Sequence, residues 1–172
     1  MSTIKHQAGF RIDQPADVLF PLFSAEGEKL WVPGWDYRNI MGSTGLHEDY
    51  VFLTKGHHTS SHPGAGHHNH DHDHHAPGHH APPETIWLVK RYDPANFLVQ
   101  FYRVEPGDKI AVISVHCKPL DQESTEVEVA YEYIGLSLKG DKFIEGYTKE
   151  THQKLISNWH SHLADYFETR SG

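Results

Sequence analysis

The sequence predicts an α+β fold in which a curved antiparallel β-sheet wraps around a long C-terminal helix, with two short helices after the first strand. Three observations support this prediction. Short segments rich in β-branched and aromatic residues alternate with turn signals through the middle of the chain. The C-terminal segment repeats apolar residues at helical spacing. The chain has 172 residues, which is enough for one domain with a single core.

The N-terminal elements follow from local patterns and from two prolines. Residues 4–12 predict the first strand, and Pro15 then suits the first turn of a helix. Pro21 falls inside that helix and should kink or split it. A second short helix is expected over residues 25–30. The segment Trp31-Val32-Pro33-Gly34-Trp35 comes next and predicts a rigid aromatic turn.

The middle of the chain predicts an antiparallel meander. Its predicted strands are the segments 48–54, 84–92, 97–104, 109–118 and 125–134; an insert separates the first two, and turn residues separate the others. The last segment alternates clearly, with one apolar and one acidic face. The apolar face holds Val127, Val129, Tyr131 and Tyr133, and the other holds Glu126, Glu128 and Glu132.

Residues 138–169 predict one long amphipathic helix. Its apolar face consists of Ile144, Tyr147, Thr151, Leu155, Trp159, Leu163 and Tyr166. Such a face must be buried, and the sheet offers an apolar surface for it. Because a strongly curved sheet rarely seals completely against a straight helix, we expect a cavity between them.

A histidine-rich insert interrupts this domain between two predicted strands. Residues 56–83 contain eleven histidines and little that could build a core. We predict a single domain over residues 1–172 in which this segment is a disordered loop. Neutral imidazole is a common ligand of zinc, copper and nickel, so the loop is expected to bind divalent metal ions. The expected ligands are His57, His58, His67, His68, His70, His72, His74, His75, His79 and His80. The alternative is a solvated low-complexity loop whose metal affinity has no biological role. No cofactor is expected to be required elsewhere.

Charge and composition exclude some partners. The formal net charge is −8, which argues against nucleic acid as the main partner. Cys117 is the single cysteine, so no disulfide can form within the chain. The sequence has no apolar run long enough to span a membrane and no apolar leader segment, and we expect a cytoplasmic protein.

One segment gives a family resemblance. Residues 26–36, Glu-Gly-Glu-Lys-Leu-Trp-Val-Pro-Gly-Trp-Asp, resemble the GE-x-x-W-x-P-G-W signature of a bacterial branch of the START-like (SRPBCC) superfamily. The segments Phe10–Val18, Trp87–Pro94 and Tyr133–Gly140 support the resemblance. It implies the helix-grip fold of polyketide cyclase-like and lipid-transfer proteins, with an apolar cavity for a small hydrophobic molecule. It implies no catalytic residue and does not predict the histidine-rich insert.

We therefore predict a hydrophobic ligand site between the sheet and the C-terminal helix. The expected lining residues are Trp31, Trp35, Tyr102, Val112, His116, Val129, Tyr131, Tyr133, Leu155 and Trp159. Glu28 is interpreted as an exposed helix carboxylate, and His152, His160 and His162 as surface residues. His116 and Cys117 point to opposite faces of a strand and cannot act on one metal or substrate. The alternatives are a cyclase- or aromatase-like enzyme, with His116, Tyr131, Tyr133 or Glu28 as its acid or base, and a metal-storage or metal-delivery protein.

Overall fold

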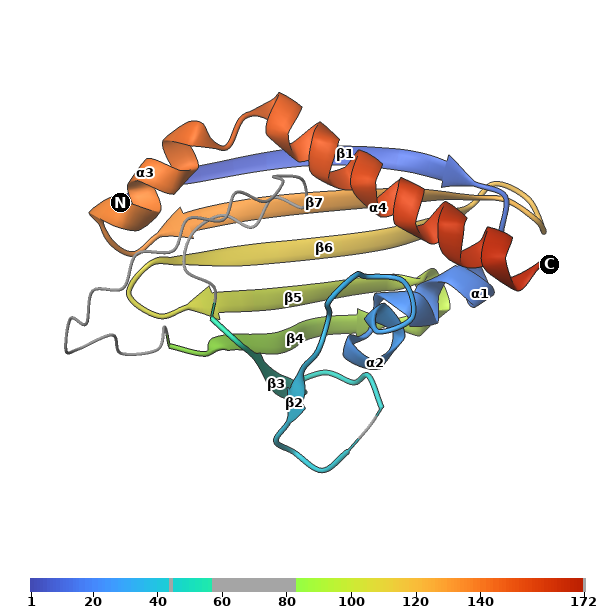
Figure 1. The fold of residues 1–172 in the computed structure, drawn as a ribbon, viewed down its shortest axis with the longest axis horizontal. Helices are drawn as coiled ribbons and strands as arrows, with labels where there is room; N and C mark the ends of the chain where they lie inside the picture. The colour runs from blue at the N-terminus through green and yellow to red at the C-terminus, as the bar shows by residue number, and fades with distance from the viewer. Residues whose placement is uncertain (44, 57–82, 172) are drawn as a thin grey trace, which may run out of the picture.

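A seven-stranded antiparallel sheet curves beneath a long C-terminal helix in the computed structural model (Figure 1). The structure describes residues 1–43, 45–56 and 83–171. The strands lie in the order β1-β7-β6-β5-β4-β3-β2. Their bounds are Thr3–Ile12 (β1), Arg38–Asn39 (β2), Val51–Thr54 (β3), Thr85–Asp93 (β4), Leu98–Glu105 (β5), Lys109–Pro119 (β6) and Thr125–Gly135 (β7). The predicted fold class is confirmed.

Register decides which residues face the helix. In β7, Val127, Val129, Tyr131 and Tyr133 are buried, as their alternation predicts. In the β6–β7 register Ile113 lies opposite Tyr131 and Val115 opposite Val129. Residues directly opposite each other in an antiparallel pair share a face. The inner face of β6 is therefore Ala111, Ile113, Val115 and Cys117, all of which are buried.

Short helices close one end of the sheet after β1. Helix α1 (Ala16–Leu19) passes directly into the 3₁₀ helix η1 (Phe20–Phe23), and Pro21 lies at the start of η1. The predicted split at Pro21 is confirmed. Helix α2 (Ala25–Glu28) follows, and the Ser24 hydroxyl accepts a hydrogen bond from the Gly27 amide at its N-terminus. A second 3₁₀ helix, η2 (Pro94–Asn96), forms the turn between β4 and β5.

The C-terminal segment forms two helices, so the prediction of one continuous helix over residues 138–169 is wrong. Helix α3 (Leu138–Gly146) ends before Tyr147, and α4 (Lys149–Arg170) begins after Thr148. The Thr148 hydroxyl accepts a hydrogen bond from the Thr151 amide and caps α4. Helix α4 then crosses the sheet diagonally (Figure 1). Its buried residues are His152, Ile156 and Leu163, while Leu155, Trp159 and Tyr166 are half-buried against the core.

One strand of the sheet, β2, was missed by the sequence analysis. Strand β2 was not predicted, because two exposed residues give no periodicity. It pairs with β3 at the edge of the sheet.

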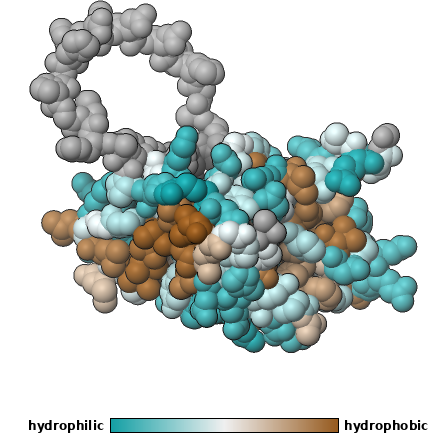
Figure 2. All heavy atoms as spheres, turned by 90° about the horizontal axis from the view of Figure 1, so that it is seen from below, coloured by the Kyte–Doolittle hydropathy of each residue, from teal (hydrophilic) through white to brown (hydrophobic). Residues whose placement is uncertain are grey.

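Figure 2 views the molecule from below, relative to Figure 1, and shows apolar side chains gathered beside hydrophilic surface. The predicted metal ligands, residues 57–80, lie outside the described residues. Within the described ranges, no helix is both long and apolar enough to cross a membrane.

Candidate functional site

An aromatic pocket lies between the inner face of the sheet and α4. Its lining comes from α2, the five strands β3 to β7, and α4: Ala25, Glu28, Phe52, Trp87, Phe101, Ile113, Val115, Tyr131 and Trp159. Its cavity volume is only about 20 Å³. That is enough for about one water molecule, whereas typical small-molecule pockets enclose roughly 300–1,000 Å³. The pocket lies where the cavity was predicted, but a void of this size between closely packed rings cannot hold a hydrophobic molecule, so the expected ligand-sized cavity is not open in this structure.

The four tryptophans of the chain surround this void. The Trp87 ring stacks on Phe52 at 5.5 Å between centroids, and the Trp159 ring lies 6.3 Å from Tyr131. Trp31 and Trp35 stand behind these lining rings: Trp31 meets Trp159 edge-on at 5.6 Å, and Trp35 meets Trp87 edge-on at 5.5 Å. Edge-to-face contacts of this kind add about 1 kcal/mol per pair beyond area burial.

The segment that gives the family resemblance builds one wall of the pocket. A side chain on Gly27 would collide with the Pro21 carbonyl, so glycine lets α2 pack against η1. The indole N–H of Trp31 donates to the Leu22 carbonyl at 2.8 Å, and that of Trp35 donates to the Ala25 carbonyl at 2.8 Å. These two hydrogen bonds fix the aromatic turn onto the preceding helices. Glu28, at the end of α2, lines the pocket as a result.

Glu28 is half-buried, and the interpretation of it as an exposed carboxylate is wrong. Burial raises the pKa of Glu28 to about 8, although the charge of Arg103 acts in the opposite direction. Glu28 is therefore mainly protonated at neutral pH. Burial also raises the pKa of Tyr131, so its hydroxyl stays neutral. The sequence contained a signal for Glu28: it precedes the buried Trp31 by three residues, and in the turn that follows α2 the Trp31 amide donates to the Glu28 carbonyl at 3.3 Å.

Arg103 is a second polar group at this site that the sequence analysis missed. It lies on β5, and its guanidinium carbon lies 5.6 Å from the Trp87 ring centroid and 5.8 Å from that of Tyr131. Two pocket-lining rings therefore contact this cation. The signal was the alternation of Val99, Phe101 and Arg103, which places the arginine on the inner face of the strand.

The predicted lining residues divide into three groups. Tyr131 and Trp159 line the pocket, and Trp31 and Trp35 support its rings. Val129, Tyr133 and Leu155 belong to the core around it. The remaining three, Tyr102, Val112 and His116, face the opposite side of the sheet, so their placement in the cavity is wrong. The register explains the error, because Val112 lies opposite Tyr102 and His116 lies opposite Glu128, which is on the acidic outer face.

His152 also departs from its interpretation as a surface residue. Its side chain is fully buried on α4. The Tyr147 hydroxyl lies 2.7 Å from Nδ1, and Nε2 lies 3.1 Å from the Val129 carbonyl. A carbonyl can only accept, so Nε2 carries the proton and Nδ1 accepts from Tyr147. This arrangement ties α4 to the α3–α4 junction and to β7, and burial lowers the pKa of His152.

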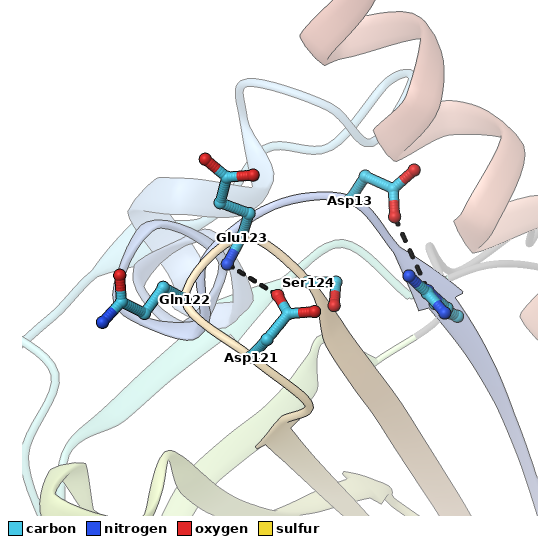
Figure 3. Close-up of a pocket in the computed structure, with 6 residues that line it drawn as sticks. Asp13, Asp121, Gln122, Glu123 and Ser124 are labelled. Carbon is cyan, nitrogen blue, oxygen red and sulfur yellow. Dashed lines mark hydrogen bonds and ion pairs between the residues drawn. The ribbon is translucent and has the colours of Figure 1, made fainter.

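A larger hollow at one end of the sheet does not form a comparable site. It encloses about 580 Å³ and is lined by Arg11, Asp13, Asp121, Gln122, Glu123 and Ser124. Figure 3 shows its carboxylates pointing in different directions: Asp13 pairs with Arg11, and Asp121 accepts from the Glu123 amide at 2.8 Å. Within the part of the chain that the structure describes, no three histidine, cysteine or carboxylate side chains are arranged to hold a metal ion.

Comparison with solved structures identifies the fold. A norcoclaurine synthase point mutant from Thalictrum flavum, in complex with a transition-state analogue, is similar with a TM-score of 0.62 and 14% identity. This match covers 98% of this chain and 97% of the synthase. The Zhui aromatase/cyclase from Streptomyces sp. R1128 is similar with a TM-score of 0.60 and 12% identity, covering 99% of this chain and 97% of that one.

Ara h 8.0201 is also similar, with a TM-score of 0.58 and 12% identity over 95% of this chain and 99% of the other. The chain has a helix-grip fold like that of these structures. No protein-family model and no curated protein matches the sequence itself. At these identities the likeness concerns the fold alone, so the activity must be argued from the pocket.

Proposed function

We propose that this START-like domain binds a small, flat hydrophobic molecule in the pocket between the sheet and α4. The observation that carries the proposal is the aromatic lining of the pocket. Four aromatic side chains line the void together with Glu28 and Tyr131: Phe52, Trp87, Phe101 and Trp159. An apolar pocket with a few converging polar groups is the usual form of a small-molecule site. The likeness in fold to a synthase solved with a transition-state analogue and to an aromatase/cyclase supports a small organic ligand. A cytoplasmic location stays a prediction from the sequence.

The void is small, so a ligand must displace rings on entry. Glu28, Trp87 and Trp159 are half-buried, whereas Phe52 and Phe101 are buried. We infer that entry takes place beside these three partly exposed residues, which belong to α2, β4 and α4. Displacement of a ring by a flat ligand exchanges one aromatic contact for another.

Intrinsic fluorescence tests this proposal, because all four tryptophans lie at the pocket. N-phenyl-1-naphthylamine, a neutral aromatic probe, is expected to quench tryptophan emission in a saturable way. The variant Ile113→Phe enlarges a lining side chain and is expected to weaken binding about tenfold. Val112→Phe makes a similar addition on the outer face and is the matched control. Circular dichroism checks that both variants fold, because overpacking a core costs about 1–3 kcal/mol. Equal affinity in the two variants would contradict the proposed location.

One observation favours acid–base chemistry as a second function of the same pocket. A general acid or base works best when its pKa lies near the working pH, and Glu28 has a pKa of about 8. A cyclase-like reaction needs such a group beside a bound hydrophobic substrate. Glu28→Gln separates the two functions, because it keeps the shape of the side chain and removes its proton transfer. Binding would be retained in this variant and turnover of a substrate lost.

We also propose that the histidine-rich tract binds divalent metal ions, an inference that rests on its sequence. Eleven histidines within residues 56–83 can supply several sets of imidazole ligands for nickel, copper or zinc. Calorimetric titration with Ni²⁺ should show several sites per chain in the full protein. Those sites should be absent after deletion of residues 57–82. An unchanged stoichiometry in the deletion variant would rule out the tract as the metal-binding segment.

A further inference from the structure

Arg103 lies beside the pocket with part of its hydrogen-bonding capacity unused. One terminal nitrogen donates to the Tyr133 hydroxyl at 3.2 Å. The Nε atom is buried and has no hydrogen-bond partner within the described part of the chain. A guanidinium carries five N–H donors, and a buried donor without an acceptor costs about 1–3 kcal/mol. The rings of Trp87 and Tyr131 face this cation from the pocket side.

The charge of Arg103 is incompletely balanced by its neighbours. Its Nε lies 3.9 Å from a Glu105 carboxylate oxygen, but the Lys109 ammonium lies nearer to that oxygen, at 3.2 Å. Lys109 also lies 3.6 Å from Asp108, which in turn lies 3.3 Å from Lys139. Three cations thus share two carboxylates in this cluster. Arg103 is the member of the cluster at the pocket, and its ion-pair contact is the longest.

The other polar groups at the pocket are neutral donors at pH 7. Glu28 is mainly protonated, and the Tyr131 hydroxyl keeps its proton. A carboxylic acid and a phenol can each donate one hydrogen bond to an oxygen atom. Glu28 and Tyr131 line the pocket, and the guanidinium of Arg103 lies 5.8 Å from the Tyr131 ring centroid, so two neutral donors and one positive charge lie close together there. This set complements a negatively charged oxygen, because hydrogen bonds between charged groups are roughly twice as strong as neutral ones.

We propose that the ligand is a flat apolar acid, whose anionic oxygens bind Arg103 and accept a hydrogen bond from Glu28. The proposal rests on the proposed function and specifies its ligand class. The apolar part of such a molecule would lie between Trp87 and Trp159, and its acidic group would point toward β5. The ligand anion would then balance the positive charge of Arg103, which Glu105 neutralises only in part because it also pairs with Lys109.

Two probes with the same ring system test the proposal. 8-Anilinonaphthalene-1-sulfonate carries an anionic group, and N-phenyl-1-naphthylamine lacks it. The folded wild-type protein is expected to bind the sulfonate about tenfold or more tightly than the neutral probe. Arg103→Met should weaken the binding of the sulfonate by about 10- to 100-fold and change the affinity for the neutral probe by less than about threefold. Arg91→Met is the control, because Arg91 is exposed and pairs with Asp93 at 3.6 Å.

The pH dependence in the wild-type protein gives a second test that needs no substitution at Arg103. The titratable groups that face Glu28 are Arg103 on β5 and Tyr131 on β7, while α4 contributes Trp159. Ionised Glu28 would repel the anion, so the preference for the sulfonate should fall about fivefold or more between pH 7 and pH 9. Glu28→Gln should retain that preference at pH 9.

The outcomes separate the two proposals. Equal affinity of the wild type for both probes, or an equal loss of both in Arg103→Met, would overturn the acid ligand and leave the hydrophobic pocket standing. Loss of preference in Arg91→Met would also overturn it, since that result would place the sulfonate on the surface. Failure of both probes to bind the wild type would overturn the proposed function and the ligand class together.

Discussion

Replacement of Glu28 by glutamine should change how the stability of the protein depends on pH. The pKa of Glu28 is about 8 in the folded protein, against an ordinary value of 4.5. Between these two values the folded state retains a proton that the unfolded state has released. The free energy of unfolding therefore falls as the pH rises through this window, by up to about 1.4 kcal/mol per pH unit. Glutamine is neutral at every pH and removes this contribution.

The size of the effect follows from the position of the side chain. For a fully buried carboxyl, the gap between 4.5 and about 8 corresponds to roughly 5 kcal/mol. Glu28 is half-buried, and partial contact with water reduces this figure. As the pH rises from 5 to 9, we expect the unfolding free energy of Glu28→Gln to increase by about 2–3 kcal/mol relative to that of the wild type.

Urea unfolding followed by tryptophan fluorescence measures this difference at pH 5, 7 and 9. All other ionisable side chains are the same in both proteins, so their contribution cancels in the comparison. Glu26→Gln is the control on the same helix: a hydrogen bond from Tyr37 lowers the pKa of Glu26, which stays ionised throughout this range. A difference between Glu28→Gln and the wild type that does not change with pH would refute the reasoning. Glu28 would then be ionised at pH 7, and the pocket would lack its carboxylic acid donor.

Two further predictions concern the elements that hold the pocket together. His152→Phe should lower the unfolding free energy by about 2–3 kcal/mol at pH 7.5, because the Tyr147 hydroxyl loses its buried acceptor. The wild type also loses stability as the pH falls below about 6.5, because the unfolded histidine binds a proton there and the buried one does not. His152→Phe should lack this pH-dependent loss. An unchanged pH profile of the unfolding free energy would contradict the role of His152. Gly140→Ala should lower the unfolding free energy by about 2 kcal/mol or more, because a Cβ there would collide with the Asp108 carbonyl. Gly146→Ala is the control: a Cβ at Gly146 meets no atom within 4 Å, so this variant should be neutral or slightly stabilising in urea unfolding.

The sequence predicted the fold because its strongest patterns agree with the tertiary structure. Alternation in β7 placed Val129 and Tyr131 on the inner face, and Pro21 marked the boundary between α1 and η1. The pattern was ambiguous in β6, where both faces are largely apolar. The orientation of β6 is decided by its register with β7, which a single sequence does not contain. Val112 and His116 were misplaced for this reason.

The polar residues of the site were harder to predict than its aromatic ones. Glutamate and arginine are usually exposed, and that general tendency misplaced Glu28 and left Arg103 unnoticed. Their burial depends on tertiary contacts: Gly27 lets α2 approach η1, and the rings around Arg103 come from β4 and β7. Two local signals were present: Glu28 lies three residues before Trp31, and Arg103 lies two residues after Phe101 on the same strand face. They indicate burial only when Trp31 and Phe101 are known to be buried.

The closeness of the rings around the void determines how the binding data must be interpreted. A pocket of about 20 Å³ has to open before a naphthalene-sized probe can enter. The observed affinity is then the intrinsic affinity reduced by the population of the open state. A substitution that loosens the packing of Trp159 would strengthen the binding of neutral and acidic probes by the same factor. A substitution of Arg103 acts on the acidic probe alone. The ratio of the two affinities therefore isolates the contribution of the charge, whereas either affinity by itself combines this contribution with the cost of opening.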